Sequence, residues 1–324
     1  MVSLSLGTAP LEIATALALA AAIGLRRWPP SDLLQPVLAV AALSLVASLG
    51  HDLRGGASVG WALALVVAVP LLPGDRTHAA RWGTGAAAVL GAGALLWAAA
   101  AAGWPARGLY SHHLTLGYVL LPALAVAVSR RWWWAAAGCA AGVLSTVSLG
   151  PALGMLVALA GTRAPRAALA GGTVLAVAII ALMQAEPALG ERAVLWASGA
   201  EVMLDNPLGV GSGSDRPALA WAQDRLSPGF YFPLHAHDAV LQVGVEVGPA
   251  GWLAWGWLLV ALWKRADQAG RAGLAAVLVG GLTQDTLGDL EVCRAVCAWA
   301  LLGEPSTLTG VQTEDDTSRV APEA

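Results

Sequence analysis

The sequence predicts an all-α fold: a polytopic bundle of about eleven membrane-spanning helices with one large extracytoplasmic loop. Hydrophobic residues make up 57% of the 324 residues and charged residues only 12%, whereas an ordinary soluble domain has about 25% charged residues. Apolar stretches long enough to cross a bilayer recur along the chain. Arginine and lysine gather in alternate loops between these stretches, which is typical of a polytopic membrane protein.

Each predicted span is a run of mostly apolar residues close to the roughly 20 that a bilayer requires. The first run has no basic region before it, so it is interpreted as a span and not as a signal peptide. The stretch 133–161 is divided into two short spans at the turn 148–151, because Pro151 lacks a backbone donor and starts a helix well. The other predicted spans lie near residues 8–25, 33–50, 58–72, 83–103, 114–129, 167–184, 239–262, 272–284 and 293–303. Residues 1–303 form the predicted transmembrane domain, and the polar residues 304–324 form a disordered tail.

The positive charges predict which loops face the cytoplasm. One set of alternate loops holds Arg26, Arg27, Arg76, Arg81, Arg130, Arg131, Arg163, Arg166, Lys264, Arg265 and Arg271. The intervening loops hold fewer: Arg54, Arg107, Arg192, Arg216, Arg225 and Arg294. Because cytoplasmic loops collect Lys and Arg, the amino terminus and the loop 185–238 are predicted to be extracytoplasmic and the carboxyl-terminal tail cytoplasmic. The net charge of −3 gives no reason to expect a nucleic-acid partner, and the three cysteines lack the spacing of a metal site.

The loop 185–238 begins with a predicted amphipathic helix that lies along the membrane surface. Its apolar face consists of Leu195, Trp196, Gly199, Val202 and Met203. Asn206-Pro207 ends this helix, because the residue before proline avoids the helical region. The following segment, PLGVGSGS, is a glycine-rich turn. Gly209 and Gly211 would let backbone N–H groups approach an anion closely; a plain turn is the alternative.

Polar residues gather where this loop enters the next span, in FPLHAHDAVLQVGVEVGPAG at 232–251. Asp238, Gln242 and Glu246 have the spacing of one helix face, and this polar stripe is about 12 Å long at 1.5 Å per residue. Ionisable groups at such depth usually face a cavity or the bundle interior. His237 lies at the rim, and a histidine side chain is a plausible proton acceptor near neutral pH. A structural histidine, with Glu246 paired to a neighbouring helix, is the alternative.

These segments together resemble the O-antigen ligase and polymerase family of polytopic, GT-C-like glycosyltransferases. Arg192-x-x-x-Trp196, then NPLGVGSG, then HAHDAVLQVGVEVGPAGW resemble the family's Pro-Leu-x-Gly-x-Gly, His-Asn-x-x-Leu-Gln and Glu-x-Gly motifs. GLYSHHLTLGYVLLP at 108–122 resembles its histidine-rich rim, and STVSLGPALG at 145–154 its Thr-x-Ser-Arg-Gly turn. The resemblance covers roughly residues 80–303 in the family's order.

The resemblance implies transfer of a glycan from a polyprenyl diphosphate to a lipid or glycan hydroxyl acceptor at the extracytoplasmic face of the bacterial inner membrane. The family performs this transfer with inversion and without a metal or cofactor. His237 would be the general base, with His235 as the alternative, and Asp238 and Glu246 would orient it or hold the acceptor. Arg192 would bind the diphosphate. The other predicted substrate-binding residues are Gln242, Arg107, His112, His113, Arg225, Gly209 and Gly211.

Two residues depart from the family pattern. Leu149 stands where the family has an arginine that helps to bind the diphosphate, and Arg107, Arg225 or the His112/His113 pair are candidates to replace it. Asp238 stands in place of asparagine, which keeps an acceptor and adds charge. A repeat-unit polysaccharide polymerase and a protein O-glycosylating transferase are alternatives within the family. A membrane transporter, which would show internal repeats, and an inactive scaffold of envelope glycan assembly are alternatives of other classes.

Overall fold

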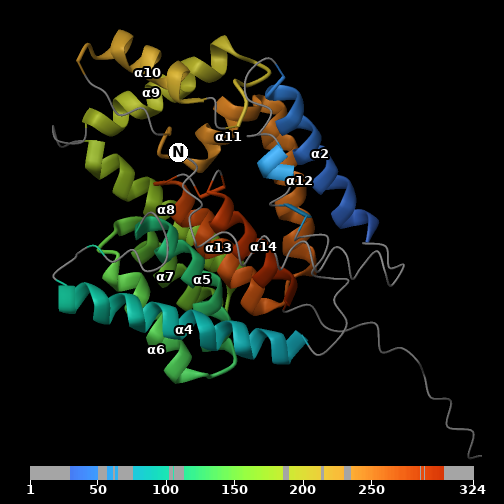
Figure 1. Ribbon diagram of the computed structural model, residues 1–324, viewed down its shortest axis with the longest axis vertical. Coiled ribbons are helices and arrows are strands. Elements are labelled where there is room, and N and C mark those ends of the chain that lie inside the picture. The colour runs from blue at the N-terminus through green and yellow to red at the C-terminus, as the bar shows by residue number, and fades with distance from the viewer. Residues whose placement is uncertain are drawn as a thin grey trace, which may run out of the picture.

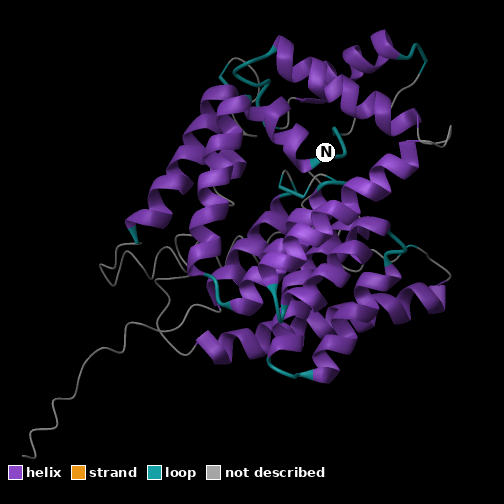
Figure 2. Ribbon diagram, turned by 180° about the vertical axis from the view of Figure 1, so that it is seen from behind, coloured by secondary structure: helices purple, strands orange, loops and turns teal. Residues whose placement is uncertain are grey.

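The computed structural model describes residues 30–49, 57–60, 63–64, 76–101, 105, 113–184, 190–212, 215–229, 235–284, 286–287 and 289–302. Every regular element within these ranges is a helix (Figure 2). The first group comprises α2 (Ser31–Ala47), α4 (Arg76–Ala101), α5 (His113–Ser129), α6 (Trp133–Ser145), α7 (Leu149–Gly161) and α8 (Pro165–Gln184). The second comprises α9 (Gly190–Asp205), α10 (Asp215–Leu226), α11 (Ala239–Val247), α12 (Pro249–Arg265), α13 (Gln268–Gly281) and α14 (Leu290–Leu302).

Helices α5 and α13 form the centre of the main bundle. The α5 side chains from Thr115 to Ala127 are almost all buried, and α13 packs against both α5 and α7. Helices approach one another where one of them has a glycine: a Cβ added to Gly142 of α6 would lie 2.5 Å from Cα of Gly91 in α4. A Cβ on Gly154 of α7 would lie 2.9 Å from the carbonyl oxygen of Ala276 in α13. Close backbone approach at small residues is the packing that helices in lipid favour.

Helices α9, α10 and α11 lie together at one end of the molecule, and α4 and α6 lie at the other (Figure 1). The face of α9 that carries Leu195, Gly199 and Val202 is buried, and α9 packs against both α10 and α11. Helix α2 runs beside α12 (Figure 1). Arg265 at the end of α12 donates a hydrogen bond of 2.6 Å to Asp32 at the start of α2, and this contact lowers the pKa of the Asp32 carboxyl.

Most predicted spans correspond to single helices. The spans near 33–50, 83–103, 114–129, 167–184, 272–284 and 293–303 correspond to α2, α4, α5, α8, α13 and α14. The predicted division of 133–161 is confirmed, because α6 ends at Ser145 and α7 begins at Leu149. Helix α4 begins at Arg76, several residues before the predicted span. The predicted span 8–25, most of the span 58–72 and the tail 304–324 lie outside the described residues.

The prediction of one continuous helix over 239–262 is wrong. The chain forms α11, ends it at Gly248 and starts α12 at Pro249. Gly248 has φ 74° and ψ −178°, a conformation that is essentially restricted to glycine. Pro249 is the first residue of α12, a position where a missing backbone N–H costs nothing. The Gly-Pro pair therefore breaks the helix six residues after Gln242 and two residues after Glu246.

One described helix segment, Thr77–Ala100, is both long and apolar enough to cross a membrane on its own. The apolar helical segments Ser31–Ala47, His113–Ser129, Trp133–Ser145, Leu149–Gly161 and Pro165–Ile179 are shorter than a full span. The predicted number of about eleven spans therefore stays a prediction.

Candidate functional site

Two histidines at the start of the polar stretch lie against one glutamine from the carboxyl-terminal third of the chain. The imidazole rings of His235 and His237 stack at an angle, with their centroids 4.0 Å apart. Gln284, which follows α13, places its Oε1 3.0 Å from Nδ1 of His237 and its Nε2 3.5 Å from Nε2 of His235. Gln284 is buried, so its amide is a fixed support for both rings.

His237 has a backbone conformation that is unusual for its residue type. Its φ is 54°, in the left-handed region, and its N–H donates a 3.2 Å hydrogen bond to Nδ1 of His235. Strained backbone of this kind clusters at functional sites. In the tautomer in which Nδ1–H donates to Oε1 of Gln284, a neutral His237 ring has its lone pair on Nε2. In that tautomer Nε2 is the atom of His237 that can accept a proton.

The side chain of Gln242 contacts the backbone of residues 235–237, which we call the histidine loop. Its Oε1 accepts a 2.9 Å hydrogen bond from the N–H of Ala236, which lies between the two histidines. Its Nε2 donates to Oδ2 of Asp215 and to Oε1 of Glu246, both at 2.8 Å. The side chain of Gln242 is only 2% exposed, and its oxygen and both its protons have partners within the protein. These contacts give Gln242 a role in positioning the loop, and they do not support its predicted role in binding substrate.

Asp238 caps the helix that follows the histidines. Its Oδ1 accepts hydrogen bonds from the N–H groups of Val240 at 2.8 Å and Leu241 at 2.9 Å, as an N-cap residue does. Burial raises the pKa of the Asp238 carboxyl, and the two backbone hydrogen bonds oppose this shift. Burial likewise raises the pKa of Asp215, with the hydrogen bond from Gln242 opposing it. Both carboxyls are thus held where the charged form is costly.

The predicted glycine-rich turn follows α9, which ends at Asp205 as the Asn206-Pro207 pair predicts. The N–H groups of Val210 and Gly211 donate 2.9 Å hydrogen bonds to the carbonyls of Val245 and Glu246 in α11. Gly209 and Gly211 both have positive φ, and a Cβ on Gly209 would lie 2.3 Å from the carbonyl oxygen of Glu246. The glycines therefore let the turn bind the end of α11. These contacts support the plain-turn alternative and not the prediction that Gly209 and Gly211 bind an anion.

Arg192 reaches the residue that precedes Gln284. Its Nη1 donates a 3.2 Å hydrogen bond to the carbonyl oxygen of Thr283. The first turn of α7 meets the same residue, because a Cβ added to Gly150 would lie 2.7 Å from Oγ1 of Thr283. Leu149, beside Gly150, is 48% exposed. The position where the resembled family has an arginine thus lies beside the residue that Arg192 contacts.

Arg225, another predicted substrate-binding residue, contacts side chains of α9 and α10. Arg225 of α10 forms an ion pair with Glu201 of α9, and its guanidinium lies 4.6 Å from the ring centroid of Trp221. His113 is the first residue of α5, near Thr115, which donates a 2.6 Å hydrogen bond to Asp289 in the segment that follows Gln284. Arg107 and His112 lie outside the described residues.

Sequence reasoning missed two residues of this cluster, Gln284 and Asp215. Gln284 lies in the last predicted extracytoplasmic segment, LTQDTLGD, whose polar residues lie on the same predicted membrane side as the histidines. The shared membrane side was the signal in the sequence that could have indicated these residues, although no motif or spacing distinguishes Gln284 from its neighbours. Asp215 follows the glycine-rich turn, and only the fold shows that it meets Gln242.

Comparison with known proteins supports the resemblance. A family model described as O-antigen ligase matches residues 108–256, which contain the histidine loop, Arg192, the glycine-rich turn and the turn at Leu149. No curated protein matches the chain. Proteins of this family are integral membrane proteins that take part in glycan transfer, and lipid-linked glycans are their donors. Residues 108–256 of this chain are thus similar to the O-antigen ligase family.

Proposed function

We propose that this protein transfers a glycan from a polyprenyl diphosphate to a hydroxyl group of a lipid acceptor at the extracytoplasmic membrane face. The proposal rests on the observation that the two histidines and Arg192 contact two successive residues, Gln284 and Thr283. Gln284 contacts both histidines, and Thr283 contacts Arg192. A proton acceptor and a phosphate-binding cation are the two groups that this transfer needs.

The proposed reaction is a single displacement. The acceptor hydroxyl oxygen attacks the anomeric carbon while its proton passes to Nε2 of His237, and the bond from that carbon to the diphosphate oxygen breaks. The electron pair of the broken bond stays on the diphosphate, whose growing charge Arg192 stabilises. One displacement inverts the anomeric carbon and requires no metal. A positioned general base contributes about 10²–10⁴-fold to such a rate.

The other polar residues act through the histidine loop. Gln242 holds the N–H of Ala236, and Asp215 and Glu246 hold the amide of Gln242. Asp238 starts α11 at the residue after His237. In this proposal Gln242, Asp215, Glu246 and Asp238 keep His237 in its strained conformation. A site preorganised in this way loses no energy to reorganisation when the substrate reacts.

Glycan transfer by the purified protein tests the proposal. The assay supplies a polyprenyl-diphosphate oligosaccharide and native envelope acceptors, with and without chelator, and compares wild type with His237→Ala and Arg192→Ala. We expect each variant to lose about 10²-fold or more of the rate, with chelator having no effect. Arg166→Ala is the matched control, because Arg166 is exposed on α8.

The product distinguishes the alternatives. The mass of the product separates transfer to a lipid acceptor from extension of the glycan itself and from transfer to a protein. The description of the matching family favours the ligase reaction. Full activity of His237→Ala and Arg192→Ala would contradict the proposed site. An inactive wild-type protein with an intact fold would favour the scaffold or transporter alternatives.

A further inference from the structure

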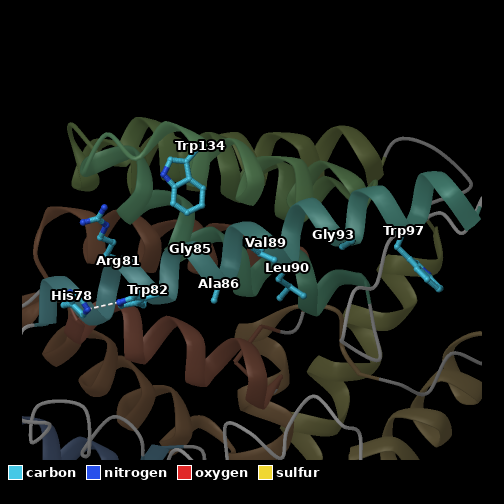
Figure 3. Close-up of a pocket in the computed structure, with 11 residues that line it drawn as sticks. His78, Arg81, Trp82, Gly85, Ala86, Val89, Leu90, Gly93, Trp97 and Trp134 are labelled. Atoms are coloured by element: carbon cyan, nitrogen blue, oxygen red, sulfur yellow. Dashed lines mark hydrogen bonds between the residues drawn. The ribbon is translucent and has the colours of Figure 1, made fainter.

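A groove lies along α4, apart from the histidine site. Its volume is about 1210 Å³, and Figure 3 shows the side chains that line it. Gly85 and Gly93 line it together with the bulky apolar side chains of Trp97 and of Trp134 in α6, and a Cβ on Gly93 would meet no other atom within 4 Å. His78, Arg81 and Trp82 lie together at the amino-terminal end of the helix (Figure 3). We call this feature the α4 groove.

The helix that carries the groove is the one described helix long and apolar enough to cross a bilayer alone. One face of α4 packs against α6, α5 and α14. Its other face exposes large apolar side chains, with Trp82, Val89 and Trp97 between 71% and 74% exposed. In a membrane protein such a face meets lipid chains. A molecule that fills the α4 groove therefore needs an apolar chain that reaches from Gly85 to Trp97.

The polar end of the groove is cationic. Arg81 lines it, and α4 has no acidic residue in its sequence, RTHAARWGTGAAAVLGAGALLWAAAA. The indole N–H of Trp82 donates a 2.7 Å hydrogen bond to Nε2 of His78. A neutral His78 ring with Nε2 as acceptor carries its proton on Nδ1, which is then a donor. The end of the groove thus offers a charged guanidinium and an imidazole N–H, and both suit an anionic oxygen.

Arginine placement assigns this end to the cytoplasmic side of the membrane. Arg76 and Arg81, in the first turns of α4, belong to the set of positive charges that the sequence predicts to be cytoplasmic. The proposed donor site, with His237 and Arg192, belongs to the opposite side. An amphiphile with an anionic head near the cytoplasm and apolar chains along the bilayer is a phospholipid of the cytoplasmic leaflet, which basic pockets on this side bind.

We propose that the α4 groove binds an anionic phospholipid of the cytoplasmic leaflet. Its phosphate contacts Arg81 and His78, and an acyl chain lies over Gly85 and Gly93 toward Trp97. This site is independent of the proposed glycan transfer.

Native mass spectrometry of the full chain in detergent tests the site, with phosphatidylglycerol and phosphatidylcholine of identical acyl chains as probes. We expect wild type to bind phosphatidylglycerol more tightly. Arg81→Gln should weaken phosphatidylglycerol binding about fivefold, which corresponds to one basic residue near a lipid surface, and leave phosphatidylcholine unchanged. Gly93→Leu should weaken the binding of both lipids, because the leucine side chain enters the groove. A Cβ on Gly93 meets no other atom within 4 Å, so the fold can accept this substitution.

Two variants on α8 are matched controls. Arg166→Gln removes an exposed charge on the same predicted membrane side, and Gly171→Leu adds a side chain where a Cβ also meets nothing within 4 Å. Both should bind lipid as wild type does. Equal binding of the two lipids, or equal weakening by the control variants, would overturn the proposal. A protein dimer that Gly93→Leu dissociates, without any bound lipid, would overturn it by assigning the groove to a second copy of the chain.

Discussion

At the scale of single residues, the candidate site depends on a few hydrogen bonds between distant parts of the chain. His237 and Gln284 are 47 positions apart, yet their side chains lie 3.0 Å from each other. In the tautomer that donates from Nδ1 to Gln284, this contact orients the imidazole with its lone pair on Nε2. The chemistry proposed for His237 therefore depends on Gln284 as a positioning residue.

Gln284→Leu removes the acceptor for Nδ1 of His237, and we expect it to lower the rate of glycan transfer about 10- to 100-fold through loss of orientation. Gln284→Glu keeps an acceptor and adds a negative charge. That charge stabilises the imidazolium, which cannot accept a proton, so the acidic limb of the pH–rate profile should shift to higher pH. Steady-state kinetics across pH measures both effects.

Gln268→Leu is the control for these variants. Gln268 begins α13, and its side chain donates to the carbonyl of Arg163, away from the histidines. Gln268→Leu should leave both rate and pH profile unchanged. An unaltered pH profile in Gln284→Glu would show that Gln284 does not act through His237.

Leu149 is the second residue whose identity matters. It is half exposed beside Gly150, which meets Thr283, and Thr283 accepts a hydrogen bond from Arg192. Leu149→Arg should therefore add a second cation to the proposed diphosphate site and lower the KM for the donor about tenfold, the value of a charged hydrogen bond of roughly 1.5 kcal/mol. Donor titrations measure this effect. Leu226→Arg, which places an arginine on another half-exposed leucine in α10, should leave KM unchanged; an equal decrease would indicate a nonspecific charge effect.

At the scale of elements, α11 is a short helix that begins and ends at defined residues. Asp238 caps its first turn, and Gly248 ends it with positive φ. The glycine-rich turn binds its last carbonyls, and a Cβ on Gly248 would lie 2.3 Å from the carbonyl oxygen of Pro207 in that turn. Two glycine-containing segments thus pack backbone against backbone, which keeps Gln242 and the histidine loop in place.

Gly248→Ala should destabilise the protein more than Gly229→Ala. Both glycines have positive φ, so either substitution costs about 1–3 kcal/mol in backbone strain. A Cβ on Gly229 meets nothing within 4 Å, whereas on Gly248 it collides with backbone, which adds about 1–3 kcal/mol. Thermal unfolding in detergent measures the difference in Tm. Equal Tm values would show that the close approach of the two segments contributes nothing to stability.

At the scale of the whole molecule, the predicted topology places the two proposed functions on opposite membrane sides. The histidine site belongs to the predicted extracytoplasmic side and the cationic end of the α4 groove to the cytoplasmic side. This separation depends on the distribution of arginine and lysine among the loops.

Cysteine labelling tests this topology. Gly229→Cys and Arg166→Cys place exposed thiols on opposite predicted sides, in a background where the buried Cys139, Cys293 and Cys297 are replaced by alanine. In intact spheroplasts a membrane-impermeant maleimide should label Gly229→Cys only, and lysis should allow labelling of Arg166→Cys. The reverse pattern would invert the topology and place the proposed transfer site in the cytoplasm.

The sequence by itself determined the helical class, most helix positions and the family resemblance, because these depend on local composition and ordered motifs. It also predicted the end of α9 and the division of 133–161 into two helices, since proline acts within a few residues of itself. The Gly248-Pro249 pair carried an equally local signal for the break between α11 and α12, although hydropathy alone predicted one span.

Only the tertiary structure decided which polar groups meet. It brought Gln284 to the histidines, Asp215 to Gln242, and Arg192 to Thr283, and it paired Arg225 with Glu201 instead. It also assigned the amides of the glycine-rich turn to the carbonyls of α11. The physical reason is that a hydrogen bond depends on distance and direction in space, and residues far apart in the chain acquire these only when the helices that carry them pack.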